Sequence, residues 1–73
     1  GSYQAAIGRF RTLLENYPKQ TFADEVLFLL GESYHREQNF KKSRTTFKKL
    51  LKYFPKSEYT EDARERLREK REG

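Results

Sequence analysis

Few side chains in this sequence are placed to do acid–base or nucleophilic chemistry. His35 is the only histidine, and Ser33 precedes it by two residues. Residues two apart on a helix do not face each other, so these side chains form no local nucleophile–base pair. The carboxylates between Glu58 and Glu72 have arginines as neighbours. We expect them to be exposed, which removes the burial that raises a catalytic pKa. The sequence therefore predicts no enzyme.

Metal and cofactor sites are not indicated either. The sequence has no cysteine, no cluster of histidines and carboxylates at ligand spacing, and no glycine-rich phosphate loop. We therefore expect no metal and no cofactor. No apolar run approaches about 18 residues, so we expect no membrane-spanning helix and no direct membrane contact.

The middle of the chain is patterned for two packed helices. Side chains at spacings of three and four form two stripes: Leu27, Leu30 and Tyr34, then Ser43, Phe47 and Leu50. Gly31 has no Cβ, which lets a neighbouring helix come close, and Pro55 ends the helix that carries the second stripe. Between the stripes, Gln38-Asn39 is typical of a turn, with Asn39 as the N-cap of the helix that contains Phe47.

These residues resemble the tetratricopeptide repeat, whose pattern runs W-x-x-L-G-x-x-Y, then A-x-x-x-F, then P. Leu27 stands where the family has Trp, and Ser43 stands where it has Ala. The resemblance implies an all-α fold, an antiparallel array of about four helices in hairpins that forms a fragment of an α-solenoid. It also implies a scaffold for protein–protein interaction.

An internal repeat recurs at a separation of 37 residues, where Phe10 matches Phe47 and Tyr17-Pro18 matches Phe54-Pro55. This variant is similar to tetratricopeptide repeat proteins of the bacterial cell envelope. Among them are the Tol–Pal-associated cell-division coordinator and an outer-membrane assembly lipoprotein. The resemblance implies a periplasmic or envelope-associated setting and a larger parent protein.

The pattern predicts one domain over residues 3–73, with helices at about 3–16, 22–36, 40–53 and 58–71. Gly1-Ser2 resembles the remnant of an expression vector. Gln20 or Thr21 is a candidate N-cap of the second helix. The fourth helix has a narrow apolar stripe and is predicted to be a terminal cap. We expect it to be supported by pairs within the helix, Asp62 with Arg66 and Glu65 with Arg68.

In the family that the chain resembles, the first helix of each hairpin lines a concave groove. The resemblance places these residues along that groove: Glu25, Phe28, Glu32, His35, Arg36, Asp62, Glu65, Glu69 and Glu72. A groove of carboxylates around one aromatic predicts a partner segment of basic or mixed charge with an apolar anchor against Phe28. An acidic ligand is disfavoured because like charges repel. Alternatively, Phe28 and Leu29 pack against a neighbouring helix.

The competing class of function is binding to nucleic acid or another anionic surface. Net charge is +5, and the stretch from Phe40 to Tyr53 interleaves aromatic residues with lysines. However, Phe47 and Leu50 occupy core positions of the repeat pattern, which leaves only salt-sensitive, sequence-independent binding by the lysines. Nucleic acid is therefore the alternative partner rather than the expected one.

The chain carries about two repeats, and arrays of this kind need about three to be stable. Four apolar residues face the position where a preceding helix would pack: Tyr3, Ala6, Ile7 and Phe10. We therefore expect self-association into a homo-oligomer through this face.

Overall fold

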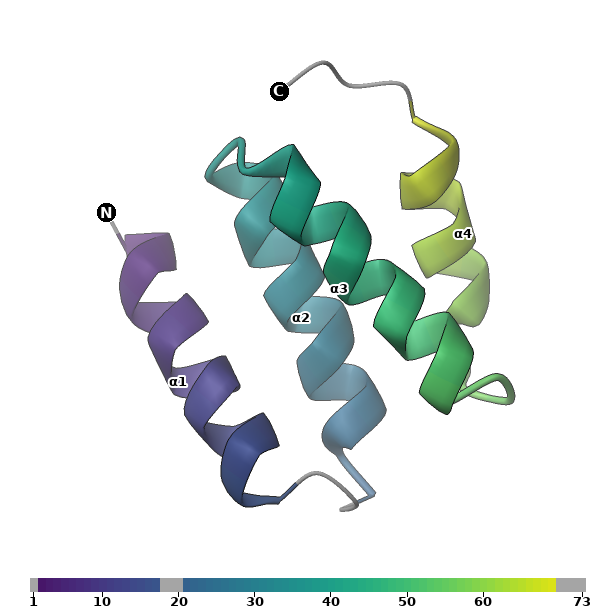
Figure 1. Cartoon of the computed structure of the whole chain (residues 1–73), viewed down its shortest axis with the longest axis horizontal. Helices are drawn as coiled ribbons and strands as arrows, with labels where there is room; N and C mark the ends of the chain where they lie inside the picture. The colour runs from purple at the N-terminus through teal and green to yellow at the C-terminus, as the bar shows by residue number, and fades with distance from the viewer. Residues whose placement is uncertain (1, 18–20, 70–73) are drawn as a thin grey trace.

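The computed structural model describes residues 2–17 and 21–69, which form four helices and no strand (Figure 1). The helices are α1 (Ser2–Asn16), α2 (Ala23–Arg36), α3 (Phe40–Tyr53) and α4 (Thr60–Arg68). Each packs against the next, and the whole forms a slab of 32 × 28 × 14 Å. The chain is therefore an all-α, tetratricopeptide-repeat-like array of antiparallel helical hairpins, as the sequence predicts.

The two predicted stripes form the centre of the slab. Leu27 of α2 packs with Phe47 and Leu50 of α3 and with Ala63 of α4. Leu30 and Tyr34 pack on the other side with Ile7 of α1. Phe47 is only 1% exposed. The interior thus consists of two apolar clusters, and the partly buried Leu14 packs against both.

Gly31 sets how closely α2 and α3 approach. A Cβ at Gly31 would lie 2.6 Å from Cε1 of Phe47. Beside this contact, the Ser43 hydroxyl donates a hydrogen bond of 2.9 Å to the Gly31 carbonyl. The serine at the family's alanine position therefore ties α3 to the backbone of α2.

The turn between α2 and α3 has the predicted chemistry. Gln38 has a φ of 63°, a left-handed conformation that reverses the chain. The Asn39 side chain then accepts a hydrogen bond from the backbone N–H of Lys42, which confirms Asn39 as the N-cap of α3.

Two other helix ends differ from the prediction. Thr21 does not cap α2, because Phe22 occupies the N-cap and its side chain makes no capping hydrogen bond. Within the first turn, the Asp24 carboxylate instead accepts a hydrogen bond of 2.9 Å from the backbone N–H of Glu25. The fourth helix begins at Thr60 rather than at residue 58, because a turn precedes it in which Ser57 Oγ accepts from the N–H of Tyr59. It ends at Arg68, since Glu69 is extended. Gln20, residues 70–71 of the predicted helix and Gly1 of the expected vector remnant lie outside the described residues.

Candidate functional site

The face that α2 and α4 share carries most of the predicted groove residues, but Phe28 is not an open anchor on it. The Phe28 ring stacks on Tyr59 of the α3–α4 turn at a centroid distance of 5.2 Å. It also packs at 5.7 Å from the ring of Phe47. The predicted contact between Phe28 and a partner therefore stays a prediction, for a ring that its own neighbours already half-bury. Its alternative, packing against a neighbouring element, is correct for Phe28.

Tyr59 is not among the groove residues that the sequence predicts, yet its ring covers Phe28 on this face. Burial raises the pKa of the Tyr59 hydroxyl, and the negative charges of Glu25, Glu58 and Asp24 raise it further. Next to it, the Ser57 hydroxyl donates to the Asp24 carboxylate, which ties the α3–α4 turn to the first turn of α2.

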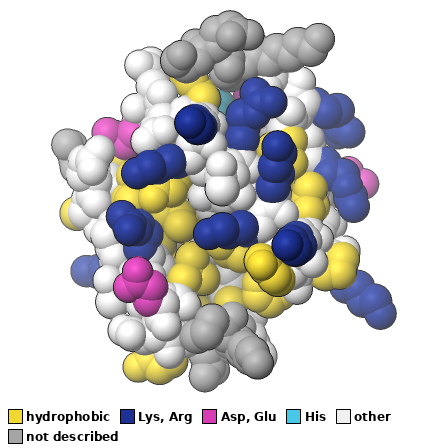
Figure 2. All heavy atoms as spheres, in the orientation of Figure 1, with side chains coloured by type: hydrophobic (Ala, Val, Ile, Leu, Met, Phe, Trp, Pro, Cys, Tyr) yellow, Lys and Arg dark blue, Asp and Glu magenta, His cyan; other side chains and the backbone are white. Residues whose placement is uncertain are grey.

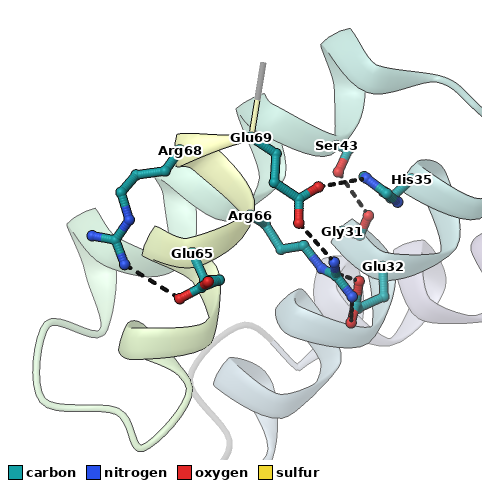
Figure 3. Close-up of polar contacts among 8 residues, drawn as sticks. All are labelled: Gly31, Glu32, His35, Ser43, Glu65, Arg66, Arg68 and Glu69. Carbon is teal, nitrogen blue, oxygen red and sulfur yellow. Dashed lines mark hydrogen bonds and ion pairs between the residues drawn. The ribbon is translucent and has the colours of Figure 1, made fainter. Parts of the chain in front are cut away.

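A charged cluster joins α4 to α2 farther along the same face (Figure 3). Arg66 binds both carboxylate oxygens of Glu32, with Nε–Oε1 and NH2–Oε2 distances of 2.8 and 3.0 Å. It also donates to Glu69 at 3.1 Å. Glu69 Oε1 lies 3.3 Å from His35 Nε2. Glu32, His35 and Glu69 thus lie together on one face. Arg66 joins the two carboxylates, and His35 contacts Glu69 directly.

The electrostatics of the cluster are set by these contacts. Burial raises the pKa of Glu69, but the hydrogen bond and charge of Arg66, with His35, outweigh it and hold that pKa below its ordinary value. Hydrogen bonding to Glu32 raises the pKa of Arg66, which stays charged. The predicted pair of Asp62 with Arg66 is therefore wrong, because Arg66 reaches across to α2 instead of along its own helix.

The remaining predicted groove residues lie at the surface. Glu25, Arg36, Asp62 and Glu65 are exposed, and Glu65 pairs with Arg68 at 3.4 Å as predicted. Glu72 lies outside the described residues. Leu29 is 39% exposed and lies four residues after Glu25, so it is on the same side of α2. The exposed apolar group of this face is therefore Leu29. The sequence could not separate it from Phe28, because both lie in one apolar run.

The predicted self-association face is only partly open. Tyr3 is exposed and Ala6 and Phe10 are half-buried, but Ile7 is 7% exposed and packs against Leu30 and Tyr34. Including Ile7 was therefore wrong, since it faces α2. Next to these residues is a hollow of about 320 Å³, lined by Ala5, Ala6, Arg9 and Phe10.

The described part of the chain offers neither a metal site nor a membrane-spanning helix. Residues 2–17 and 21–69 contain no group of three or more histidines, cysteines or carboxylates placed to hold a metal ion. No helix within those ranges has the length and apolarity needed to cross a membrane.

A sequence model of the tetratricopeptide repeat matches residues 25–57, a little less than half of the chain. The matched segment contains most of α2, the capped turn, α3 and the turn after it. No curated protein and no solved structure gives a significant match. The matched repeat, set in an array of helical hairpins, supports a tetratricopeptide repeat family for this chain.

Proposed function

We propose that the chain is a protein–protein interaction module that binds a partner segment of basic or mixed charge on the face shared by α2 and α4. Tetratricopeptide repeats are in general non-catalytic interaction scaffolds, which supports the class of function. The observation that carries the choice of face is the exposure of Leu29 one helical turn from exposed Glu25 on α2, with exposed Asp62 on α4.

The charge of this face favours a basic segment. Exposed Glu25 of α2 and exposed Asp62 of α4 add negative charge that the Arg66 cluster does not use, whereas Glu65 is paired with Arg68. Asp62 precedes Arg66 by four residues and therefore lies on the side of α4 that reaches α2. Lysines or arginines of a partner would meet these carboxylates at the rim, where charge chiefly sets specificity and association rate.

The apolar anchor on this face is Leu29 rather than Phe28. Because Phe28 is stacked between Tyr59 and Phe47, a partner gains little contact with it unless α4 moves. Leu29 is exposed without any such movement. A partner residue such as leucine or phenylalanine would cover it, with basic residues on either side.

A titration of isotope-labelled protein with a short peptide of lysines around a central phenylalanine tests this proposal. We expect amide shift changes at Glu25, Leu29 and Asp62. The Glu25→Lys/Asp62→Lys variant should bind several-fold more weakly, because two attractions become repulsions. The matched control is Glu15→Lys/Glu61→Lys, which changes net charge equally. Equal weakening in both variants, or shifts confined to other helices, would refute the assignment.

The setting in a bacterial envelope protein remains a hypothesis that rests on the Tyr17-Pro18 and Phe54-Pro55 resemblance alone. Self-association is likewise a proposal, now confined to Tyr3, Ala6 and Phe10 beside the hollow on α1. A second copy of the chain packed against this face would remove apolar surface from water, which is the general driving force of association.

A further inference from the structure

A trough lies between α1 and α3, with α2 as its floor. Both outer helices pack on α2, and the space that they leave has a volume of about 550 Å³. Its floor is mostly apolar and is made by Leu14 of α1 and by Leu27, Leu30 and Tyr34 of α2. A smaller hollow of about 190 Å³ continues it past Tyr34 and Lys42, next to a hydrogen bond from Gln4 to Glu37.

The rim of the trough is positively charged. Arg11 of α1 and Lys41, Lys42 and Lys49 of α3 line it, against a single carboxylate, Glu15. Figure 2, which has the orientation of Figure 1, shows dark-blue lysine and arginine side chains spread around yellow apolar surface on this side of the molecule. Within residues 2–17 and 21–69, none of these four cations is in a salt bridge. The Lys42 ammonium instead lies 5.8 Å from the centre of the Tyr34 ring.

We propose that this trough binds an acidic amphipathic helix of a protein partner. The apolar residues of such a helix recur every three or four positions, so one side of it would enter between α1 and α3. Carboxylates on the flanks of the same helix would reach the lysines of α3 on one side and Arg11 on the other. The charge complementarity therefore selects the partner, and the floor adds only a small apolar contact, because Leu27, Leu30 and Tyr34 are 6–8% exposed.

The dimensions of the trough suit a helix. α3, which forms one wall, lines the trough from Lys41 to Lys49, a stretch that rises about 12 Å, or roughly two turns of a partner helix. The trough is open to solvent along this length rather than enclosed, so it fits an elongated ligand better than a small molecule.

Two other anionic ligands fit the trough less well. Nucleic acid that binds basic grooves gains by stacking bases on exposed rings. Here the Tyr34 ring is 8% exposed and that of Phe47 is 1% exposed. A lipid bilayer would meet the lysines, but its flat surface would not reach a floor recessed between two helices. Binding of either ligand is therefore an outcome that the experiment distinguishes.

The probe is a stapled helix of about 14 residues, matched in length to α3, with leucines on one side and glutamates on both flanks. Stapling removes the nucleation cost that would leave so short a peptide unfolded in water. Binding is measured by fluorescence anisotropy and by amide shifts of labelled protein. We expect shifts at Leu14, Leu30 and Thr46, and weaker binding at higher salt, as screening of exposed charges requires.

The decisive comparison uses two double variants of α3 that change net charge equally. Lys42→Glu/Lys49→Glu reverses two rim charges, whereas Lys48→Glu/Lys52→Glu reverses two lysines of the same helix that do not line the trough. All four side chains are exposed, so both variants should melt as the unaltered chain does. The rim variant should bind the probe roughly tenfold more weakly and the control less than about twofold, since only rim charges meet the probe.

Equal weakening in the two variants would overturn the proposal, because it would reduce the effect to net charge. Absence of probe binding would also overturn the proposal. In that case, binding of a DNA oligonucleotide or of phosphatidylserine vesicles that depends on Lys42 and Lys49 would assign the trough to that ligand instead. The inference concerns another face and the opposite charge from the α2–α4 proposal, so either can fail while the other stands.

Discussion

Replacing Gly31 by alanine tests the close approach of α2 and α3. On helix propensity alone, Gly31→Ala should stabilise the protein by about 1 kcal/mol. However, the added Cβ would lie 2.6, 2.7 and 2.9 Å from three atoms of the Phe47 ring, where ordinary contact is 3.4–4 Å. Phe47 is 1% exposed and packs against the Phe28 ring, so it cannot move aside without disturbing its neighbours.

The clash should outweigh the gain in propensity. Overpacking a well-filled interior costs about 1–3 kcal/mol, and three ring atoms in conflict place this site at the upper end. Subtracting about 1 kcal/mol of propensity leaves a net loss of about 2 kcal/mol in the free energy of unfolding. In a chain of this size that loss lowers the melting temperature by roughly 8–16 °C.

Gly8 provides the matched control, because it is also within a helix but has nothing within 4 Å of the position of a Cβ. Gly8→Ala should therefore stabilise the protein by about 0.5–1 kcal/mol. Urea unfolding monitored by far-UV circular dichroism measures both changes. The double variant Gly31→Ala/Phe47→Leu should recover part of the loss relative to the two single changes, as coupled neighbours do. If Gly31→Ala stabilises the chain as Gly8→Ala does, the helices are not packed as described.

Three further outcomes are expected. Arg66→Ala should lower the free energy of unfolding by about 1 kcal/mol, because its bidentate pair with Glu32 is only partly exposed. Arg68→Ala, which breaks an exposed pair, should change that free energy by less than about 0.5 kcal/mol. Equal losses for the two variants in chemical denaturation would contradict this. Because the pKa of Glu69 is lowered on folding, its contribution is present above the ordinary value of 4.5 and is lost as pH falls through the folded pKa. Glu69→Gln should therefore reduce the melting temperature at about pH 7 and progressively less as the pH falls below 4.5, and a reduction that does not shrink in acid would refute the reasoning. Light scattering at high concentration should show a dimer that Ala6→Glu disrupts, and a monomer with a cooperative melt would exclude self-association.

The core was predictable because its pattern is local. Leu27, Leu30 and Tyr34 lie one helical turn apart, so their shared burial results from helix geometry whatever packs against them. The same holds for Asn39, whose capping partner is three residues away. Burial and capping that involve residues within about one turn can therefore be predicted directly from residue spacing.

The candidate face was only partly predictable, because its contacts join residues distant in sequence. Phe28 and Leu29 are equally apolar neighbours, and only the position of Tyr59 decides which is covered. Arg66 has Asp62 within reach along its own helix, yet it binds Glu32, 34 residues away. The partner that a long charged side chain binds depends on which helix packs beside it, and residue spacing alone does not specify the neighbouring helix.

The attachment of α4 combines little apolar burial with ion pairs and hydrogen bonds. Its buried residues are Thr60 and Ala63, and α1 buries only Ile7 among its described side chains, whereas α2 buries seven. Polar contacts add to this small apolar contact at both ends of α4, through Ser57 to Asp24 and through Arg66 to Glu32. Exposed and half-exposed charges of this kind are weakened by salt and acid, while apolar burial is not. Conditions that screen or protonate these groups should therefore loosen α4 before α1–α3, and loosening it would uncover Phe28 on the same face that carries Leu29.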